Sequence, residues 1–292
     1  MPPEKFLAYD FGAESGRAIL GNLDRKKFSL EEIHRFPNKQ ITVSEHIHWD
    51  VTYLFDELKR GLTAAAQKGY TDLSGLGVDT WGVDFGLVGK DNQILENPYH
   101  YRDRRTEGMM ELAFQRMPRE EMYARTGIQF LQFNSVFQLL SVIESKSPSL
   151  ERIETLLFMP DLFNFLLTGQ KKSEYTIAST SQLLDSKKKE WESVIFENLG
   201  LPRHIMAPVI QPGTLIGPLL SEIARETGIL SVEVIVPACH DTASAVAAVP
   251  AQSDNWAYLS SGTWSCIGVE VEEPIINEDS MLNNFTNEGL SL

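Results

Sequence analysis

One carboxylic acid stands between an apolar run and a stretch of small residues in the segment HDTASAV, residues 240–246. Asp241 follows VEVIVPAC, which has the composition of a buried strand, and precedes TASAVAAV, which has the composition of a helix. A helix start favours an ionised carboxylate, the form that a general base needs to accept an alcohol proton during phosphoryl transfer. A plain helix N-cap or a metal ligand would have the same local sequence.

Two glycine-containing segments offer the donors that phosphate oxygens require. The first, GAESGR at 12–17, supplies backbone N–H groups and the Arg17 cation. The second lies in AYLSSGTWSCIGVE at 257–270, which repeats the strand, small-residue tip and strand of AYDFGAESGRAILG at 8–21. Two facing tips would hold a polyphosphate from both sides, whereas turn geometry alone would also explain Gly12 and Gly16.

Two further places could hold a metal ion. Asp10 ends the strand before the first tip, where a carboxylate can bind Mg²⁺ or its waters, although a hairpin-capping aspartate is the alternative. His46 and His48 in HIHWD would share one face of a strand. Because a third ligand at convincing spacing is missing, we expect these histidines to lie on an ordinary exposed face.

A sugar-binding pattern occurs in DTWGVDF, residues 79–85, at the end of a predicted strand, where open α/β sheets hold ligands. The indole of Trp81 could pack against the C–H face of a sugar while carboxylates accept its hydroxyls. Core packing of Trp81 is the alternative. The segments YRDRRT and GIQFLQFNS read on their own as ion-paired surface and loop residues: Arg102, Asp103, Arg105, Gln129, Gln132 and Asn134.

The elements that would position these residues follow from apolar periodicity. Residues 5–36 predict three successive strands, the first two joined by the glycine-containing tip. Asp50 is the predicted N-cap of an amphipathic helix, and 73–83 predict a buried strand. We expect a hairpin at 85–95 and mainly helices from about 104 to 230.

Composition limits the partners. Twenty-six basic and forty acidic residues give a net charge of −14 without a dense basic cluster, which argues against nucleic acid. Because no stretch approaches the roughly 18 apolar residues of a membrane span, we expect no membrane partner and a cytoplasmic location. Cys239 and Cys266 are too few for a disulfide framework and are expected to be buried free thiols.

Eight segments in this order resemble the FGGY family of carbohydrate kinases, from about residue 5 to residue 289: DFGAESGR, GVDTWGVDF, YRDRRT, GIQFLQFN, MPDLFNFLLTG, EYTIASTSQL, HDTASAV and YLSSGTWS. The resemblance implies an α/β, actin-like (ribonuclease H-like) two-domain kinase fold closing around ATP, Mg²⁺ and a sugar. The expected reaction is phosphorylation of the 1-hydroxyl of L-rhamnulose in rhamnose catabolism. The alternatives are another ketose or polyol (xylulose, fuculose, glycerol) or an inactive sugar-binding fragment.

The resemblance also implies roles for single residues. Asp241 would be the general base, with Gly82, His240 and Thr242 as sugar contacts, to which the local pattern adds Trp81 and Asp84. The expected ATP-phosphate contacts are Ala13, Glu14, Ser15, Gly16, Arg17 and Thr263, with Asp10 as the magnesium-side carboxylate. Residues 1–248 would form the N-terminal sugar-binding and catalytic domain. Residues 249–292 would begin an incomplete C-terminal nucleotide-binding domain, with the adenosine site beyond residue 292.

Overall fold

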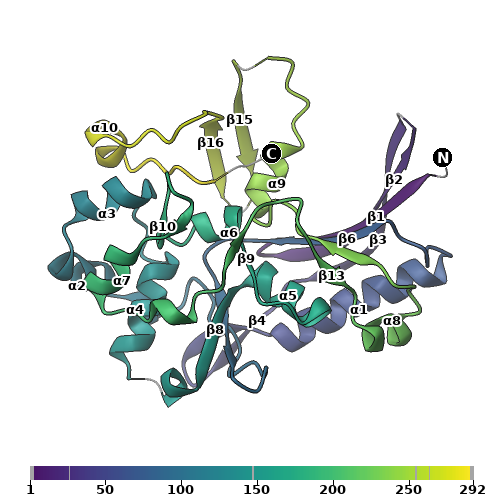
Figure 1. The fold of residues 1–292 in the computed structure, drawn as a ribbon, viewed down its shortest axis with the longest axis horizontal. Helices are drawn as coiled ribbons and strands as arrows, with labels where there is room; N and C mark the ends of the chain where they lie inside the picture. Colours follow the sequence, from purple (N-terminus) through teal and green to yellow (C-terminus); the bar gives the residue numbers. More distant parts are fainter. Residues whose placement is uncertain (1–2, 26, 147, 254, 263, 290–292) are drawn as a thin grey trace.

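The computed structural model describes residues 3–25, 27–146, 148–253, 255–262 and 264–289. At its centre lies a six-stranded sheet of order β13-β14-β6-β1-β2-β3 (Figure 1). Its strands are β1 (Glu4–Phe11), β2 (Ser15–Asp24), β3 (Lys27–Pro37), β6 (Gly75–Thr80), β13 (Leu215–Pro218) and β14 (Glu233–Ile235). β1, β2 and β3 are antiparallel neighbours, whereas β6 runs parallel to β1 and to β14. The three predicted N-terminal strands are therefore confirmed.

The alternation along β1 separates a covered face of the sheet from an open one. Leu7, Tyr9 and Phe11 are fully buried, and Ala8 between them is exposed. The covered face packs against α1 (Val51–Gln67) and α5 (Met159–Thr168), with α8 (Ser221–Thr227) beside α1. The Tyr9 hydroxyl donates to a backbone carbonyl of α1 at 2.7 Å. As predicted, the Asp50 side chain caps α1, accepting from the backbone N–H of Tyr53.

A second apolar core lies beside the sheet and is mainly helical, as predicted for 104–230. It contains α2 (Met109–Arg116), α3 (Arg119–Thr126), α4 (Ser135–Glu144), α6 (Tyr175–Ser179) and α7 (Ser193–Leu199). The expectation missed β8 (Ile153–Phe158), which pairs antiparallel with β7 (Phe85–Gly89). The sequence of β8, IETLLF, is a nearly continuous apolar run, and periodicity cannot distinguish such a strand from a buried helix. The turn predicted at 90–92 is present, but residues 94–95 add only a single bridge to β7.

Short elements complete the first 240 residues. The strands are β4 (Gln40–Val43), β5 (His46–Trp49), β9 (Ser173–Glu174), β10 (Leu184–Asp185), β11 (Glu190–Trp191) and β12 (Val209–Ile210). The 3-10 helices are η1 (Arg104–Thr106), η2 (Pro148–Arg152) and η3 (Arg203–Ile205). The strand expected over VEVIVPAC (232–239) is reduced to β14, and an isolated bridge between Thr80 and His240 follows it. This bridge places the start of the next helix beside the end of β6.

The last part of the chain contains the second predicted hairpin. After α9 (Asp241–Ala247), β15 (Ala257–Ser261) and β16 (Ser265–Val269) pair antiparallel and project from the body (Figure 1). Leu259 and Ile267 on this hairpin are 69% and 78% exposed. Cys239 is buried as expected, but Cys266 is exposed because it lies on the same projecting hairpin. Residues 275–289, including α10 (Glu278–Leu282), return to the helical part near α3.

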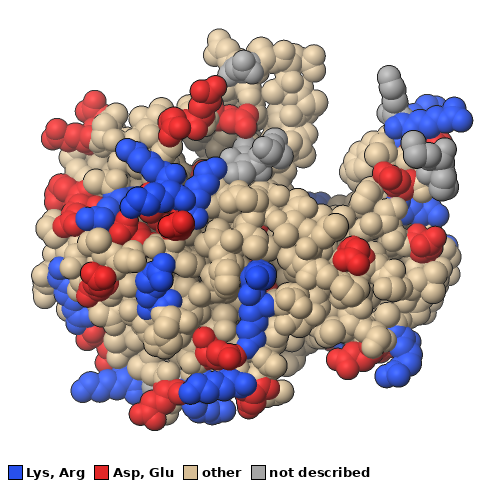
Figure 2. Space-filling view, in the orientation of Figure 1, with Lys and Arg blue, Asp and Glu red and all other residues tan. Residues whose placement is uncertain are grey.

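The surface carries both charges. Figure 2 shows acidic and basic side chains on the same face, with a hollow between the projecting β15–β16 hairpin and the end of the sheet at which the chain begins. Within the described ranges, helices long and apolar enough for a membrane span are absent.

Candidate functional site

An open cleft of about 1930 Å³ lies where β1 and β6 end and α9 begins. The first hairpin tip lines it, and the Ser260–Gly262 tip of β15–β16 lines the same cleft. The cleft brings together most of the predicted site residues: Asp10, Ala13, Glu14, Ser15, Arg17, Trp81, Gly82, His240, Asp241 and Thr242. Thr263, the remaining predicted phosphate contact of the second tip, lies outside the described residues. Two further residues line the cleft: Asp79, which belongs to the predicted sugar-binding segment but was not assigned individually, and Glu288, which the sequence analysis did not single out.

Asp241 is the first residue of α9 and not its N-cap. The N-cap position belongs to His240, whose side chain makes no capping bond, and Asp241 Oδ1 accepts the Thr242 backbone N–H at 2.7 Å. Burial raises the pKa of Asp241, and the cation of His240 opposes that rise. The expectation that the helix start alone keeps Asp241 ionised is therefore replaced by a balance between burial and a neighbouring charge.

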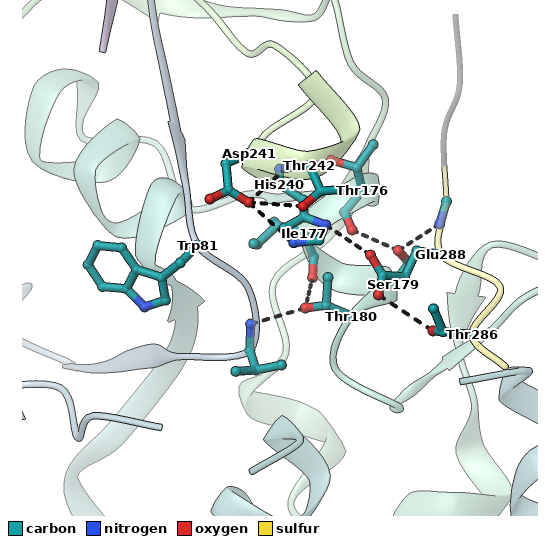
Figure 3. Close-up of polar contacts among 12 residues, drawn as sticks. Trp81, Thr176, Ile177, Ser179, Thr180, His240, Asp241, Thr242, Thr286 and Glu288 are labelled. Carbon is teal, nitrogen blue, oxygen red and sulfur yellow. Dashed lines mark hydrogen bonds and ion pairs between the residues drawn. The ribbon is translucent and has the colours of Figure 1, made fainter. Parts of the chain in front are cut away.

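His240 lies between two carboxylates (Figure 3). Its Nε2 is 3.5 Å from Oδ1 of Asp241, and its Nδ1 is 3.0 Å from Oε2 of Glu288. Burial lowers the pKa of His240, but the carboxylates of Glu288, Asp241 and Glu174 together outweigh burial, with Glu288 contributing most, and raise that pKa to about 9. For Glu288, burial alone would raise the pKa, but the contact with His240 outweighs burial and lowers that pKa below its ordinary value. At neutral pH the imidazole is therefore a cation with N–H donors on both sides.

Asp79 is one of the two carboxylates of the predicted sugar-binding segment DTWGVDF, but it was not assigned a role of its own. It is the direct parallel neighbour of Asp10, across the β1–β6 pairing, and lines the cleft. Burial raises the pKa of Asp79 well above its ordinary value, and the charges of Asp10 and Asp241 add to that rise. A signal was present in the sequence, because an aspartate is the next-to-last residue of both β1 and β6, but using it required knowing that the two strands are adjacent.

An ion pair lies at the base of the first hairpin tip, the one proposed to contact phosphate. Arg17 donates from Nε and Nη2 to Oδ2 of Asp10 at 2.9 and 2.7 Å, and the two residues are direct partners in the β1–β2 register. Gly16 is buried, and a Cβ there would lie 2.2 Å from the Phe36 ring. Packing against Phe36 therefore requires this glycine, whereas the expectation was a direct phosphate contact.

The cleft also offers an oxygen donor of the kind that Mg²⁺ requires. Oxygen donors suit this ion, which is commonly held by one or two carboxylates together with waters and substrate phosphates. Asp10 lines the cleft beside the first tip and offers such a carboxylate. Among the residues that the structure describes, a preformed cluster of three or more His, Cys, Asp or Glu ligands is absent. The donor chemistry therefore fits an ion completed by waters and phosphates.

Asp84 corrects the sugar-contact prediction, because its side chain is 0% exposed and cannot face the cleft. It accepts from the indole N–H groups of Trp49 and Trp81 at 2.6 and 3.0 Å, and from Gln138 and the Tyr101 backbone at 2.8 and 3.1 Å. Burial raises the pKa of Asp84 to about 6 in spite of these donors. Asp84 therefore orients Trp81, which is only 5% exposed and whose ring centroid is 4.1 Å from that of Trp49.

The YRDRRT segment is also more buried than expected. Asp103 is 3% exposed and accepts from His46 at 3.0 Å, and His48 is buried instead of lying on an exposed face. Arg105 donates to Gln138 at 2.7 Å and lies 3.9 Å from the Tyr99 ring centroid. Burial lowers the pKa of Arg105 to about 10. Arg105 is thereby linked to Asp84 through Gln138, which donates to the Asp84 carboxylate.

Gly82 occupies a confined position next to His240. A Cβ at Gly82 would lie 3.3 Å from His240 Nε2 and 3.4 Å from Thr180 Cγ2. Thr180 in turn accepts the backbone N–H of Val83 at 3.1 Å. The absence of a side chain at position 82 therefore leaves the imidazole and the adjoining part of the cleft accessible.

Comparisons with known proteins agree with this arrangement. Residues 6–248 match the model of the N-terminal domain of the FGGY family of carbohydrate kinases. The chain is 46% identical over 286 residues to a rhamnulokinase of Bacteroides thetaiotaomicron, covering 98% of this chain and 59% of that protein. It is 44% identical over 283 residues to a rhamnulokinase of Oceanobacillus iheyensis, covering 97% and 60%. The chain thus spans about three fifths of the length of these relatives.

Solved structures show the same fold. A gluconate kinase from Lactobacillus acidophilus superposes with a TM-score of 0.84 at 19% identity, covering 95% of this chain and 56% of that one. A xylulose kinase from the same organism superposes with a TM-score of 0.83 at 19% identity, again covering 95% of this chain and 56% of that one. The predicted α/β kinase fold is therefore confirmed. The family match over 6–248 and the rhamnulokinase similarity over nearly the whole chain lead to one conclusion: this chain belongs to the FGGY family of carbohydrate kinases.

Proposed function

We propose that the protein carrying this chain phosphorylates L-rhamnulose with ATP, forming L-rhamnulose 1-phosphate in rhamnose catabolism. The observation that carries the proposal is the position of Asp241, which lines one cleft together with both hairpin tips. The similarity to rhamnulokinases over 97–98% of the chain supports L-rhamnulose as the sugar. The proposed location is the cytoplasm, where ATP is available.

In the proposed mechanism Asp241 accepts the proton of the sugar 1-hydroxyl. The O–H bond breaks as the sugar oxygen bonds to the γ-phosphorus, and the bond from that phosphorus to the ADP oxygen breaks. Positioning and charge neutralisation supply most of the rate enhancement in reactions of this class. His240 and Thr242 flank the base and are the proposed hydroxyl partners. Gly82 leaves room beside the His240 imidazole, and Trp81 is proposed to pack against the sugar.

The phosphates of ATP are proposed to lie between the two tips. Ala13, Glu14, Ser15 and Arg17 line the cleft from one side, and Ser260–Gly262 line it from the other, adjacent to the proposed contact Thr263. Gly16 is proposed to shape this tip through its packing on Phe36. Mg²⁺, when bound, would neutralise phosphate charge, and Asp10 is the residue proposed to hold it or its waters. The proposed domain division places residues 1–248 on the sugar side and 249–292 on the nucleotide side.

A coupled assay of ADP release tests this function directly. The protein carrying this chain is given ATP, Mg²⁺ and a panel of L-rhamnulose, xylulose, fuculose and glycerol. We expect the highest kcat/KM with L-rhamnulose, and equal or better turnover of another sugar would refute the substrate assignment. Calorimetry on the 292-residue chain separates an inactive fragment from a sugar-binding one, because only the latter releases heat on addition of L-rhamnulose.

A further inference from the structure

The segment that carries Glu288 is fixed to the helical part of the molecule by its asparagines. Asn284 accepts the Phe130 backbone N–H at 2.7 Å and donates to the Phe130 carbonyl at 3.2 Å. Asn287 donates to the Gly127 carbonyl at 3.0 Å and accepts the Ile275 backbone N–H at 2.7 Å. The bonds to Gly127 and Phe130 join the segment to a part of the chain more than 150 residues earlier. These hydrogen bonds therefore fix the backbone of the segment at two positions, Asn284 and Asn287.

Glu288 is held on both sides along the chain. Asn287 before it is anchored as described, and the backbone N–H of Gly289 after it donates to the Ser179 hydroxyl at 2.8 Å in a buried contact. With both neighbours fixed, the Glu288 carboxylate meets His240 Nδ1 at 3.0 Å, as the close-up shows (Figure 3). The other carboxylate oxygen is 3.5 Å from the Thr286 hydroxyl.

The backbone of His240 is fixed from the opposite side. Its N–H donates to the Thr176 hydroxyl at 3.1 Å, and the N–H of Cys239 donates to Glu174 at 3.0 Å. The charged groups that act on the imidazole are Glu288, Asp241 and the buried Glu174, with Asp79 on the neighbouring strand. Of these, only Glu288 and Asp241 make ion-pair contacts with the ring nitrogens in the described structure.

We infer that Glu288 is a positioning residue that holds the His240 imidazole with Nδ1–H on its own carboxylate and Nε2–H directed at Asp241. This inference rests on the proposed role of Asp241 as the base. A neutral imidazole bonded to Glu288 through Nδ1–H would present a bare Nε2, which accepts instead of donating. Retaining the second proton keeps a donor and a positive charge beside Asp241, where burial disfavours the carboxylate.

NMR titration of the histidine ring protons in the 292-residue chain tests the pairing without requiring activity. His240→Asn identifies the His240 signal by its loss. In the wild-type chain we expect this signal to titrate near pH 9, and in Glu288→Gln we expect the midpoint to move toward the ordinary value of 6.5. Glu278→Gln, which removes an exposed carboxylate of the same segment, is the matched control and should leave the midpoint unchanged.

Kinetics on the protein carrying this chain test what the pairing does. Glu288→Gln should shift the alkaline limb of the kcat profile to lower pH and reduce kcat at pH 8 about tenfold, with little change in the KM for ATP. Glu288→Asp, which retains the charge, should recover part of the loss. A purely structural role would lower the Tm and leave the alkaline limb in place.

The outcomes separate the two proposals. A His240 midpoint that is unchanged in Glu288→Gln overturns the inference whatever the activity, as does an unchanged alkaline limb in an active enzyme. A shifted His240 midpoint in a protein that transfers phosphate to no sugar overturns the proposed function and confirms the Glu288–His240 pairing.

Discussion

Arg17 and Asp10 face each other across the first hairpin, and two nitrogens of the guanidinium donate to a single carboxylate oxygen. The residue proposed to bind phosphate is thus paired with the residue proposed to face Mg²⁺. Both side chains are partly exposed, 43% and 31%, so the pair should contribute less than about 1 kcal/mol to stability. We therefore expect Arg17 to matter more for the proposed phosphate binding than for folding.

Replacing Arg17 with alanine should therefore affect ATP far more than folding. We expect the KM for ATP to rise about tenfold or more, because a charge-assisted contact to phosphate is lost. The affinity for L-rhamnulose, measured by calorimetry, should change little. A normal KM for ATP in this variant would show that Arg17 serves only to neutralise Asp10.

Gly82→Ala tests the confined space next to His240. The added methyl would lie 3.3 Å from Nε2 of the imidazole, so the ring or Thr180 must move by a few tenths of an ångström. We expect the dissociation constant for L-rhamnulose, measured by calorimetry, to rise about tenfold. Gly262→Ala is the control for sugar affinity, since a Cβ there meets nothing within 4 Å. Equal sugar affinity in both variants would contradict the assignment of Gly82.

Asp84→Ala tests a structural role for the buried carboxylate. Removing it leaves the indole N–H groups of Trp49 and Trp81 and the backbone N–H of Tyr101 buried without their acceptor. We expect the free energy of unfolding in urea to fall by about 3 kcal/mol. Asp56→Ala breaks only the exposed pair with Arg60 and should cost less than about 1 kcal/mol. Similar losses in the two variants would disprove the role of Asp84.

The pH dependence of stability should reflect His240. Its pKa is about 9 in the folded protein against 6.5 ordinarily, so the folded state binds the proton more tightly than the unfolded state. The resulting stabilisation is fully present below pH 6.5 and is lost as the pH rises through about 9. The difference in unfolding free energy between the wild-type chain and His240→Asn should therefore shrink over this window. A constant difference would mean that the pKa of His240 is not raised.

The sequence was sufficient where local patterns decide the structure. Alternation in residues 5–11 and the cap at Asp50 were correctly predicted because both depend on neighbours within a few positions. The repeated strand–tip–strand pattern likewise predicted a second hairpin, which the structure contains.

What could not be predicted depends on contacts between distant parts of the chain. Glu288 has no periodic signal, and its contact with His240 exists only because the segment at 275–289 folds back. Asp84 and Trp81 lie three positions apart, yet only the packed structure shows that one orients the other. Asp79 becomes the neighbour of Asp10 only through the parallel pairing of β1 and β6.

The central claim is that Asp241 accepts the sugar proton, and Asp241→Asn tests it most directly in the protein carrying this chain. The amide retains the size of the side chain but cannot take up the proton. Phosphoryl transfer from ATP to L-rhamnulose should fall by about 10²- to 10⁴-fold, while calorimetry should show nearly unchanged affinity for the sugar. Phosphoryl transfer within a few fold of the wild-type rate would contradict the account.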